Sequence, residues 1–234
     1  MLRVESVYKS YKQGERELEV LKDLNFEIKE GEFVVILGPS GSGKTTLLNI
    51  IGGLDIPTKG KVYLNEDELS AYNETQLTLL RRDRIGFIFQ FFNLMPTLTA
   101  LENVDFSRDI VRKTGNNYNG QTLLKMVGLY ERRNHFPSQL SGGEQQRVAI
   151  ASSLANDPDI VLCDEPTGEL DYRTGRKIID LLRKLNKKEN KTVVIVTHNA
   201  VIGKTADRIF HLHNGEVADI ETIKKPLDPL KLEW

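Results

Sequence analysis

"GPSGSGKTT", residues 38–46, follows the apolar run "FVVIL" of residues 33–37 and leads into a helix-like stretch. A glycine-rich loop between a buried strand and a helix, with the spacing Gly-x4-Gly-Lys-Ser/Thr, is typical of a phosphate-binding loop. Backbone N–H groups of such a loop wrap a phosphate chain, Lys44 reaches the β- and γ-phosphates, and the Thr45 hydroxyl can hold Mg²⁺. The segment therefore predicts a nucleoside triphosphate site at the end of a strand.

The rest of the chain alternates short apolar runs with helix-like segments. Strands are expected at residues 24–28, 60–65, 84–90, 159–164 and 192–198, and helices at 44–51, 141–156 and 174–188. A hairpin is expected over residues 208–220, turning at Asn214-Gly215. Buried-type strands that alternate with amphipathic helices predict an α/β fold with a mostly parallel core sheet, after a β-rich N-terminal region.

Two segments depart from this alternation. Between about residues 97 and 134 the chain is polar with apolar residues at helical spacing, and "GNNYNG" (residues 115–120) is typical of a loop, so we expect a mainly helical insertion with a break. The tail "KKPLDPLKLEW" (residues 224–234) has two prolines and mixed charge. We expect this tail to be irregular and solvent-exposed, with a frayed terminus, although a contact of Trp234 with a partner is an alternative.

Composition limits the class of protein. The 234-residue chain has a formal net charge of −1, which disfavours general nucleic-acid binding. Its single cysteine, Cys163, excludes an internal disulfide, fits a reducing compartment and is expected to be a core thiol. The start of the chain has no signal-peptide pattern, and no apolar run approaches the roughly 20 residues that span a membrane. We therefore expect a cytoplasmic protein whose membrane role, if any, comes from a partner.

Three expected strands end in polar side chains. Asp164 suits Mg²⁺ through water, and Glu165 is free to orient or deprotonate an attacking water, because successive residues of a strand point different ways. Gln90 can touch Mg²⁺ or that water, and His198 can donate a hydrogen bond to a γ-phosphate. Taken alone, the Asp-Glu pair could instead mark a helix start, and the histidine could be structural.

A second glycine motif lies in "LSGGEQQR", residues 140–147. Ser141 is a good helix N-cap, and the two glycines after it leave backbone N–H groups bare, so the motif predicts a helix N-terminus facing an anion. The loop "FFNLMPTLT" (residues 91–99) crowds aromatic and aliphatic side chains, which indicates either a docking surface or anchoring of the insertion. Tyr11 could stack on an adenine ring.

Together, "GPSGSGKT", Gln90, "LSGGEQQR", "CDEP" and His198, in this order and spacing, resemble the ATP-binding subunit of an ATP-binding cassette (ABC) transporter. The resemblance runs from about residue 2 to 220. It implies a P-loop ABC-type ATPase domain over residues 1–220 and a C-terminal tail over residues 221–234. The domain would hold a mostly parallel core sheet, an N-terminal antiparallel β subdomain and an α-helical subdomain inserted at about residues 97–155.

The resemblance also implies ATP and Mg²⁺ as cofactors and ATP hydrolysis as the reaction. The catalytic residues that it implies are Glu165, His198, Gln90 and Lys44. Those that it implies for binding ATP are Tyr11, Gly38, Pro39, Ser40, Gly41, Ser42, Gly43, Lys44, Thr45, Thr46, Ser141, Gly142, Gly143, Glu144 and Asp171. The metal ligands that it implies are Thr45, Gln90 and Asp164.

Partners follow from the same resemblance. It implies a homodimer in the ATP-bound state, with the motif at Ser141 facing the γ-phosphate held by the second copy. The segments at residues 52–62 and 81–106 are similar to the group that pairs with FtsX-type permeases, which includes lipoprotein-releasing, macrolide-export and antimicrobial-peptide-resistance systems. An integral membrane permease is then expected at Gln90–Thr99, with the chain peripheral on the cytoplasmic face of the cell membrane and no nucleic-acid partner.

Two positions depart from the family pattern. Residues 168–171 read "GELD" where the family more often has Ser-Ala-Leu-Asp, so Glu169 adds a charge near the expected subunit interface. Ser152 stands where the family commonly has arginine. Neither position touches the core chemistry, so we expect an active ATPase.

Other classes of protein fit less well. A P-loop kinase or GTPase would leave the 140–147 motif unexplained, and the chain has no guanine-selecting Asn-Lys-x-Asp. A soluble ABC-type ATPase acting on a non-transport macromolecular partner is the main alternative. A module that binds ATP without hydrolysing it is disfavoured by the intact Glu165 and His198.

Overall fold

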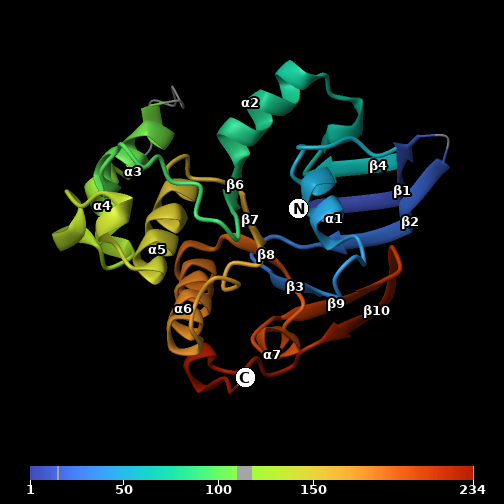
Figure 1. Cartoon of the computed structure of the whole chain (residues 1–234). Coiled ribbons are helices and arrows are strands. Elements are labelled where there is room, and N and C mark those ends of the chain that lie inside the picture. The colour runs from blue at the N-terminus through green and yellow to red at the C-terminus, as the bar shows by residue number, and fades with distance from the viewer. Residues whose placement is uncertain (15, 110–117, 234) are drawn as a thin grey trace.

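The computed structural model describes residues 1–14, 16–109 and 118–233. The strands in these residues form two sheets, shown in Figure 1. The smaller sheet is antiparallel, in the order β2-β1-β4-β5, and consists of β1 (Leu2–Gln13), β2 (Arg16–Ile28), β4 (Lys59–Leu64) and β5 (Asp67–Glu68). The larger sheet has the order β10-β9-β3-β8-β7-β6 and consists of β3 (Phe33–Leu37), β6 (Ile85–Ile88), β7 (Ile160–Asp164), β8 (Thr192–Thr197), β9 (Arg208–His213) and β10 (Glu216–Thr222).

Some helices pack on the larger sheet, and α3, α4 and α5 form a group to one side of it (Figure 1). The α-helices are α1 (Lys44–Ile51), α2 (Glu74–Arg84), α3 (Ala100–Asp109), α4 (Gly120–Met126), α5 (Gly142–Ser153), α6 (Tyr172–Glu189) and α7 (Ala200–Gly203). Short 3₁₀ turns are η1 (Leu69–Ala71), η2 (Tyr130–Arg132), η3 (Pro137–Gln139) and η4 (Pro229–Lys231). None of the helices in the described ranges is long and apolar enough to cross a membrane.

The larger sheet brings several strand ends to one edge. Strands β9, β3, β8, β7 and β6 are parallel, and only β10 joins antiparallel. Every residue of β8 is buried, as expected for a strand covered on both faces. Leu37 of β3 pairs with Thr197 of β8, and Asp164 of β7 pairs with Val196. The segments that follow β3, β7 and β8 therefore start side by side, where open parallel sheets usually bind ligands.

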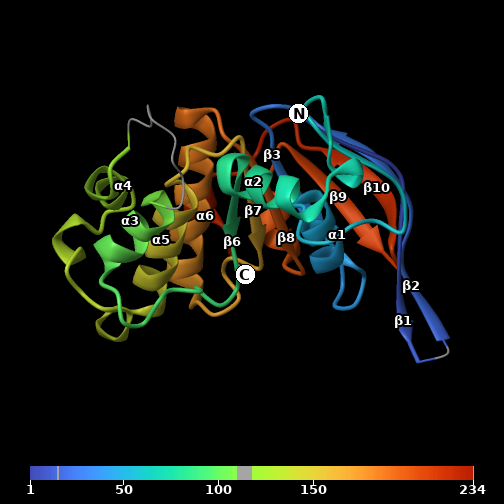
Figure 2. The same cartoon turned by 90° about the horizontal axis from the view of Figure 1, so that it is seen from above.

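Two apolar cores flank this sheet. One core joins it to α3, α4, α5 and α6, which gather on the side away from β1 and β2 (Figures 1 and 2). The other lies between the larger sheet, α1 and the smaller sheet. The expected α/β architecture, with a mostly parallel sheet, an antiparallel N-terminal sheet and inserted helices, is confirmed. Residues 110–117, which hold most of the expected loop "GNNYNG", lie outside the described part of the chain.

The sequence predicted no helix at α2, no strand at β1 and only the last part of β2. Helix α2 buries only Leu77 and Leu80, so its apolar periodicity is too short to stand out. Its local signal is a capping box in which Asn73 accepts a hydrogen bond from the Gln76 N–H and the Gln76 side chain accepts one from the Asn73 N–H. The expected strand at residues 84–90 is shorter than predicted, because β6 ends at Ile88 and Gln90 lies beyond it.

The described C-terminal tail is irregular apart from η4 and mostly exposed, as expected, but two of its residues, Pro229 and Leu232, are buried. The tail lies against α6 and α7 (Figure 1), and Leu232 is only 1% exposed. The Tyr172 hydroxyl donates a hydrogen bond to the Leu232 carbonyl at 2.5 Å, and the Arg176 guanidinium donates one to the Leu230 carbonyl at 2.9 Å. Side chains at the start of α6 thus satisfy tail carbonyls, a pairing that the local sequence does not reveal. Trp234 lies outside the described residues.

We expect Leu232→Ala to lower the stability of the protein. Truncating a fully buried leucine costs about 2–3 kcal/mol, which should lower Tm by on the order of 5 °C in a domain of this size. Thermal unfolding followed by circular dichroism measures the change. Leu230→Ala is the matched control, because Leu230 lies in the same tail but is 45% exposed. Equal Tm values for the two variants would contradict the packing described for the tail.

Candidate functional site

The phosphate loop follows β3 and ends at the N-terminus of α1. Gly43, the N-cap of α1, has φ +100°, and a Cβ there would lie 2.7 Å from Leu21 Cδ2, so this position requires glycine. Lys44 is 8% exposed, and its ammonium donates hydrogen bonds to the carbonyls of Gly38 and Pro39, each at 2.9 Å. The loop therefore curls around its own lysine, which places a positive charge beside the bare N–H groups of a helix N-terminus.

Thr45 and Asp164 meet across the strand edge. The Thr45 hydroxyl donates a hydrogen bond to Asp164 Oδ1 at 3.3 Å. Burial and the adjacent Glu165 carboxylate raise the pKa of Asp164 above its ordinary value, although the Thr45 bond and Lys44 oppose the shift. Within the described residues, no group of three His, Cys, Asp or Glu side chains could hold a metal. A hydroxyl and a single carboxylate fit a cation that takes few protein ligands and keeps water or phosphate oxygens.

Glu165 is held by three donors from the end of β8. Its Oε2 accepts a hydrogen bond from the Thr197 hydroxyl at 2.8 Å, and its Oε1 accepts one from the His198 N–H at 3.0 Å. His198 Nδ1 lies 2.8 Å from the same Oε1. The backbone of Glu165 has φ +45°, a conformation that costs a residue other than glycine about 1–3 kcal/mol. This strained turn directs Glu165 towards β8 while Asp164 faces Thr45, so the two carboxylates diverge as predicted.

Two further polar residues of the site were not predicted. Thr197 is 1% exposed and orients Glu165, as described above. Gln146 on α5 is 0% exposed, and its Nε2 donates hydrogen bonds to the carbonyls of Pro166 at 3.0 Å and Phe89 at 3.5 Å. A signal was present in both cases. A hydroxyl ends an otherwise apolar strand, and a glutamine lies on the buried face of a helix.

Gln90 lies after β6, and Tyr11 lies on β1. Gln90 Nε2 donates a hydrogen bond to Glu169 Oε1 at 3.0 Å, which links the loops after β6 and β7. The Tyr11 hydroxyl donates one to Asp55 Oδ2 at 2.7 Å, and the Tyr11 ring is 39% exposed. Partial burial and the Asp55 bond raise the pKa of Tyr11, while a side-chain bond with Thr46 opposes the shift. Tyr11 therefore lies beside the phosphate loop with part of its ring open to solvent.

The motif at Ser141 forms a capping box at the start of α5. The Ser141 hydroxyl accepts a hydrogen bond from the Glu144 N–H at 3.3 Å, and Glu144 Oε2 accepts one from the Ser141 N–H at 2.9 Å. That N–H lowers the pKa of Glu144. The N–H groups of Gly142 and Gly143 stand in the first turn, where no intrahelical acceptor exists. Among the described residues, no hydrogen bond joins this motif to the phosphate loop.

Asp171 caps α6 and so has a role within the chain. Its carboxylate accepts hydrogen bonds from the N–H groups of Arg173 and Thr174, at 3.0 and 3.1 Å. The Thr174 hydrogen bonds lower the pKa of Asp171. A Cβ at Gly143 would lie 2.2 Å from Thr174 Cγ2, so α5 and α6 approach closely at this point. The start of α5 and the start of α6 are thereby fixed to each other.

A model of the ABC transporter family matches residues 21–168. The chain belongs to the ABC transporter family. It is 51% identical to the uncharacterized ABC transporter ATP-binding protein MJ0796 of Methanocaldococcus jannaschii, over 96% of this chain and 98% of that protein. The dimeric structure of MJ0796 in a post-hydrolysis state, bound to ADP and Pi, superimposes with a TM-score of 0.86 at 49% identity, over 96% of this chain and 100% of that chain.

Other relatives in the ABC transporter family indicate the subgroup. The lipoprotein-releasing system ATP-binding protein LolD of Legionella pneumophila is 45% identical, over 93% of this chain and 96% of LolD. The macrolide export ATP-binding/permease protein MacB of Bdellovibrio bacteriovorus is 44% identical over 96% of this chain, which spans 34% of MacB. The predicted similarity to the lipoprotein-release and macrolide-export group is confirmed. The chain is the ATP-binding, ATP-hydrolysing subunit of an ABC transporter.

Proposed function

We propose that two copies of this subunit hydrolyse ATP between them and drive an FtsX-type permease from the cytoplasmic face of the membrane. The observation that carries the proposal is the arrangement of Glu165, which is oriented by Thr197 and His198 next to the phosphate loop. The similarity to LolD, of a lipoprotein-releasing system, and to MacB, a macrolide export ATP-binding/permease protein, supports a membrane permease as the partner. The alternative, a soluble ABC-type ATPase with a non-transport partner, lacks such an observation.

The reaction is in-line attack of water on the γ-phosphate, and it depends mainly on positioning and charge stabilisation. The phosphate loop and Lys44 hold the phosphates. Three donors fix the Glu165 carboxylate at the strand edge. From this position it accepts the proton of the attacking water. The His198 side chain is 65% exposed, so its Nε2 is open to the γ-phosphate. Because Nδ1 donates to Glu165, Nε2 donates to that phosphate when both ring nitrogens carry a proton. Tyr11 stacks on the adenine.

Mg²⁺ fits the pair Thr45 and Asp164, with Gln90 as a third oxygen donor. Burial and the neighbouring Glu165 carboxylate raise the pKa of Asp164, and a bound cation would favour its ionised form. When bound, Mg²⁺ neutralises phosphate charge. The chain's own contribution is to hold the hydroxyl of Thr45 and the carboxylate of Asp164 3.3 Å apart.

The dimer follows from the separation of two half-sites. The motif Ser141–Glu144 has a helix N-terminus suited to an anion, yet no hydrogen bond of the described chain brings it to its own phosphate loop. In a two-fold dimer each motif meets the ATP of the other copy, and Asp171 lines the same interface. The dimeric MJ0796 structure supports this arrangement.

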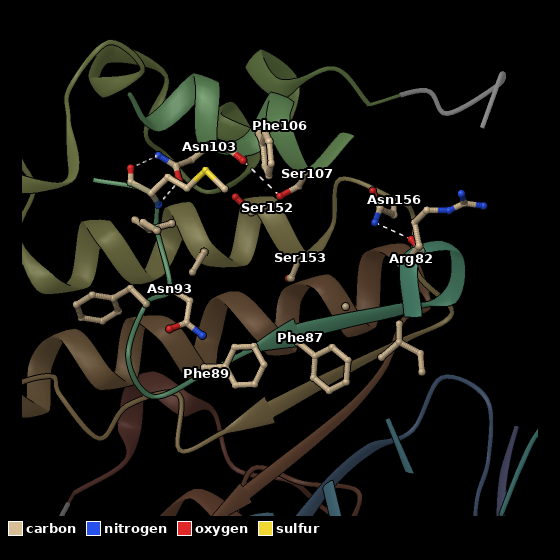
Figure 3. A pocket seen from close by; sticks show the side chains of 16 residues that line it. Arg82, Phe87, Phe89, Asn93, Asn103, Phe106, Ser107, Ser152, Ser153 and Asn156 are labelled. Atoms are coloured by element: carbon tan, nitrogen blue, oxygen red, sulfur yellow. Dashed lines mark hydrogen bonds between the residues drawn. The ribbon is translucent and has the colours of Figure 1, made fainter. Parts of the chain in front are cut away.

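The permease docks in a groove between β6 and the inserted helices. Phe87 and Phe89 line one side with rings stacked 5.6 Å apart, and Phe106 of α3 lines the other, beside Ser152 of α5 (Figure 3). Met95, from the predicted docking segment Gln90–Thr99, borders it and is 40% exposed. An apolar groove that solvent reaches is suited to an amphipathic helix of the permease.

We expect Phe106→Glu to abolish permease-coupled ATPase activity without changing basal activity, because a carboxylate in the groove opposes apolar docking. A photoreactive residue at Met95 should crosslink to an integral membrane protein of the FtsX type, and Phe106→Glu should remove the crosslink. Leu18→Glu is the control, because Leu18 is also exposed, at 54%, but lies on β2 far from the groove. A crosslink to a soluble protein would instead support the alternative function.

A further inference from the structure

In the loop that departs from the family pattern, both Gly168 and Glu169 contact Gln90. Glu169 Oε1 accepts the hydrogen bond from Gln90 Nε2 at 3.0 Å. A Cβ built at Gly168 would lie 3.1 Å from that nitrogen and 3.2 Å from Gln90 Cδ, so the Gln90 side chain lies flat against the Gly168 backbone. A serine at 168 would require the Gln90 side chain to shift by a few tenths of an ångström, and an alanine at 169 would offer it no acceptor.

A carboxylate distinguishes the two ends of the Gln90 amide. A primary amide has a donor end, Nε2, and an acceptor end, Oε1, of nearly the same shape. The Glu169 carboxylate can only accept, so it binds the Nε2 end and leaves Oε1 on the other side of the amide. Only Oε1 can ligate a cation or accept a hydrogen bond from water.

The backbone around this pair is held by a separate contact. Gln146 of α5 donates to the Phe89 carbonyl, next to Gln90, and to the Pro166 carbonyl, three residues before Glu169. Gln146 is 0% exposed, so these bonds are shielded from water. Gln146 therefore holds the backbones of the two loops at a fixed separation. The exposed Gln90–Glu169 hydrogen bond then orients the Gln90 side chain between them.

We propose that Glu169 is a positioning residue, which orients the Gln90 amide so that its carbonyl oxygen serves the metal ion and the attacking water. The inference rests on the role proposed above for Gln90 at the Mg²⁺ site. It also gives Glu169 a function within its own subunit, beyond the charge that it adds near the expected interface.

The test compares Glu169→Ala with Glu169→Gln, whose amide carbonyl can still accept from Gln90 Nε2. Glu169→Ala should raise the Mg²⁺ concentration for half-maximal ATP hydrolysis roughly threefold to tenfold, the effect of one hydrogen bond. Glu169→Gln should recover only part of this shift, because its amide can also donate to Gln90 Oε1 and so no longer selects the Nε2 end. In a Gln90→Ala background, Glu169→Ala should have no further effect.

A nucleotide-free measurement separates this inference from the proposed function. The side-chain ¹H–¹⁵N amide signals of Gln90, identified by their loss in Gln90→Ala, should move in Glu169→Ala and move less in Glu169→Gln. Unmoved signals in Glu169→Ala, or equal Mg²⁺ shifts for the alanine and glutamine variants, would overturn the inference alone. A wild-type chain that hydrolyses no ATP would overturn the proposed function, while the amide signals would still decide the role of Glu169.

Discussion

We expect Glu165→Gln to bind ATP without turning it over. The substitution removes the proton acceptor and should lower the rate of hydrolysis by at least about 10²-fold, the usual contribution of a general base. The fold around it should persist, because the amide keeps the shape of the carboxylate. Its carbonyl can accept from the His198 N–H, and the Thr197 hydroxyl can rotate to accept from its NH₂ group while it still accepts from the Asn199 N–H.

The variant should also accumulate a dimer with trapped ATP. Phosphate release measures turnover, and size-exclusion chromatography with light scattering in ATP and Mg²⁺ measures the association state. Lys44→Ala is the control, because it removes the ammonium at the centre of the phosphate loop and should stay monomeric under the same conditions. A Glu165→Gln protein that remains monomeric with bound ATP would show that this chain does not close its site with a second copy.

The parts of the site that the sequence predicted are those with local causes. The phosphate loop needs a residue in the left-handed backbone conformation before its helix, which favours glycine. The sequence shows this residue directly as Gly43, at the fixed spacing of the motif. Asp164 ends one apolar strand and His198 follows another. The two residues are brought together because neighbouring parallel strands end at the same edge of a sheet. The fold class followed from the same alternation of strands and helices.

The parts that the sequence did not predict depend on distant partners. Thr197 and Gln146 acquire roles only when β7 lies beside β8 and α5 covers both loops. The tail has too few apolar residues to predict a docked segment, and the donors that fix it, Tyr172 and Arg176, lie more than fifty residues away. Side chains that satisfy distant backbone carbonyls leave no periodic pattern in the chain.

A complementation experiment should decide which copy supplies the motif at Ser141. Ser141→Arg removes the N-cap of α5 and places a long side chain where an anion would meet the helix N-terminus. In a homodimer of this variant both sites are defective, and in a homodimer of Glu165→Gln neither site has its base. A mixed dimer of the two variants contains one site with an intact Glu165 from one copy and an intact Ser141 from the other, provided that the motif acts across the interface.

Mixing the two inactive variants should therefore restore hydrolysis at about a quarter of all sites, since half of the dimers are mixed and each has one complete site. Single-turnover cleavage of labelled ATP is the measurement, because product release from the paired Glu165→Gln site then does not limit the signal. If the motif acted on the ATP of its own subunit, each subunit would carry one defect and its own site would stay inactive in every pairing. If the mixture hydrolyses ATP no faster than the separate variants, Ser141 acts on the ATP of its own subunit. If mixing restores activity, Ser141 acts on the ATP of the partner subunit.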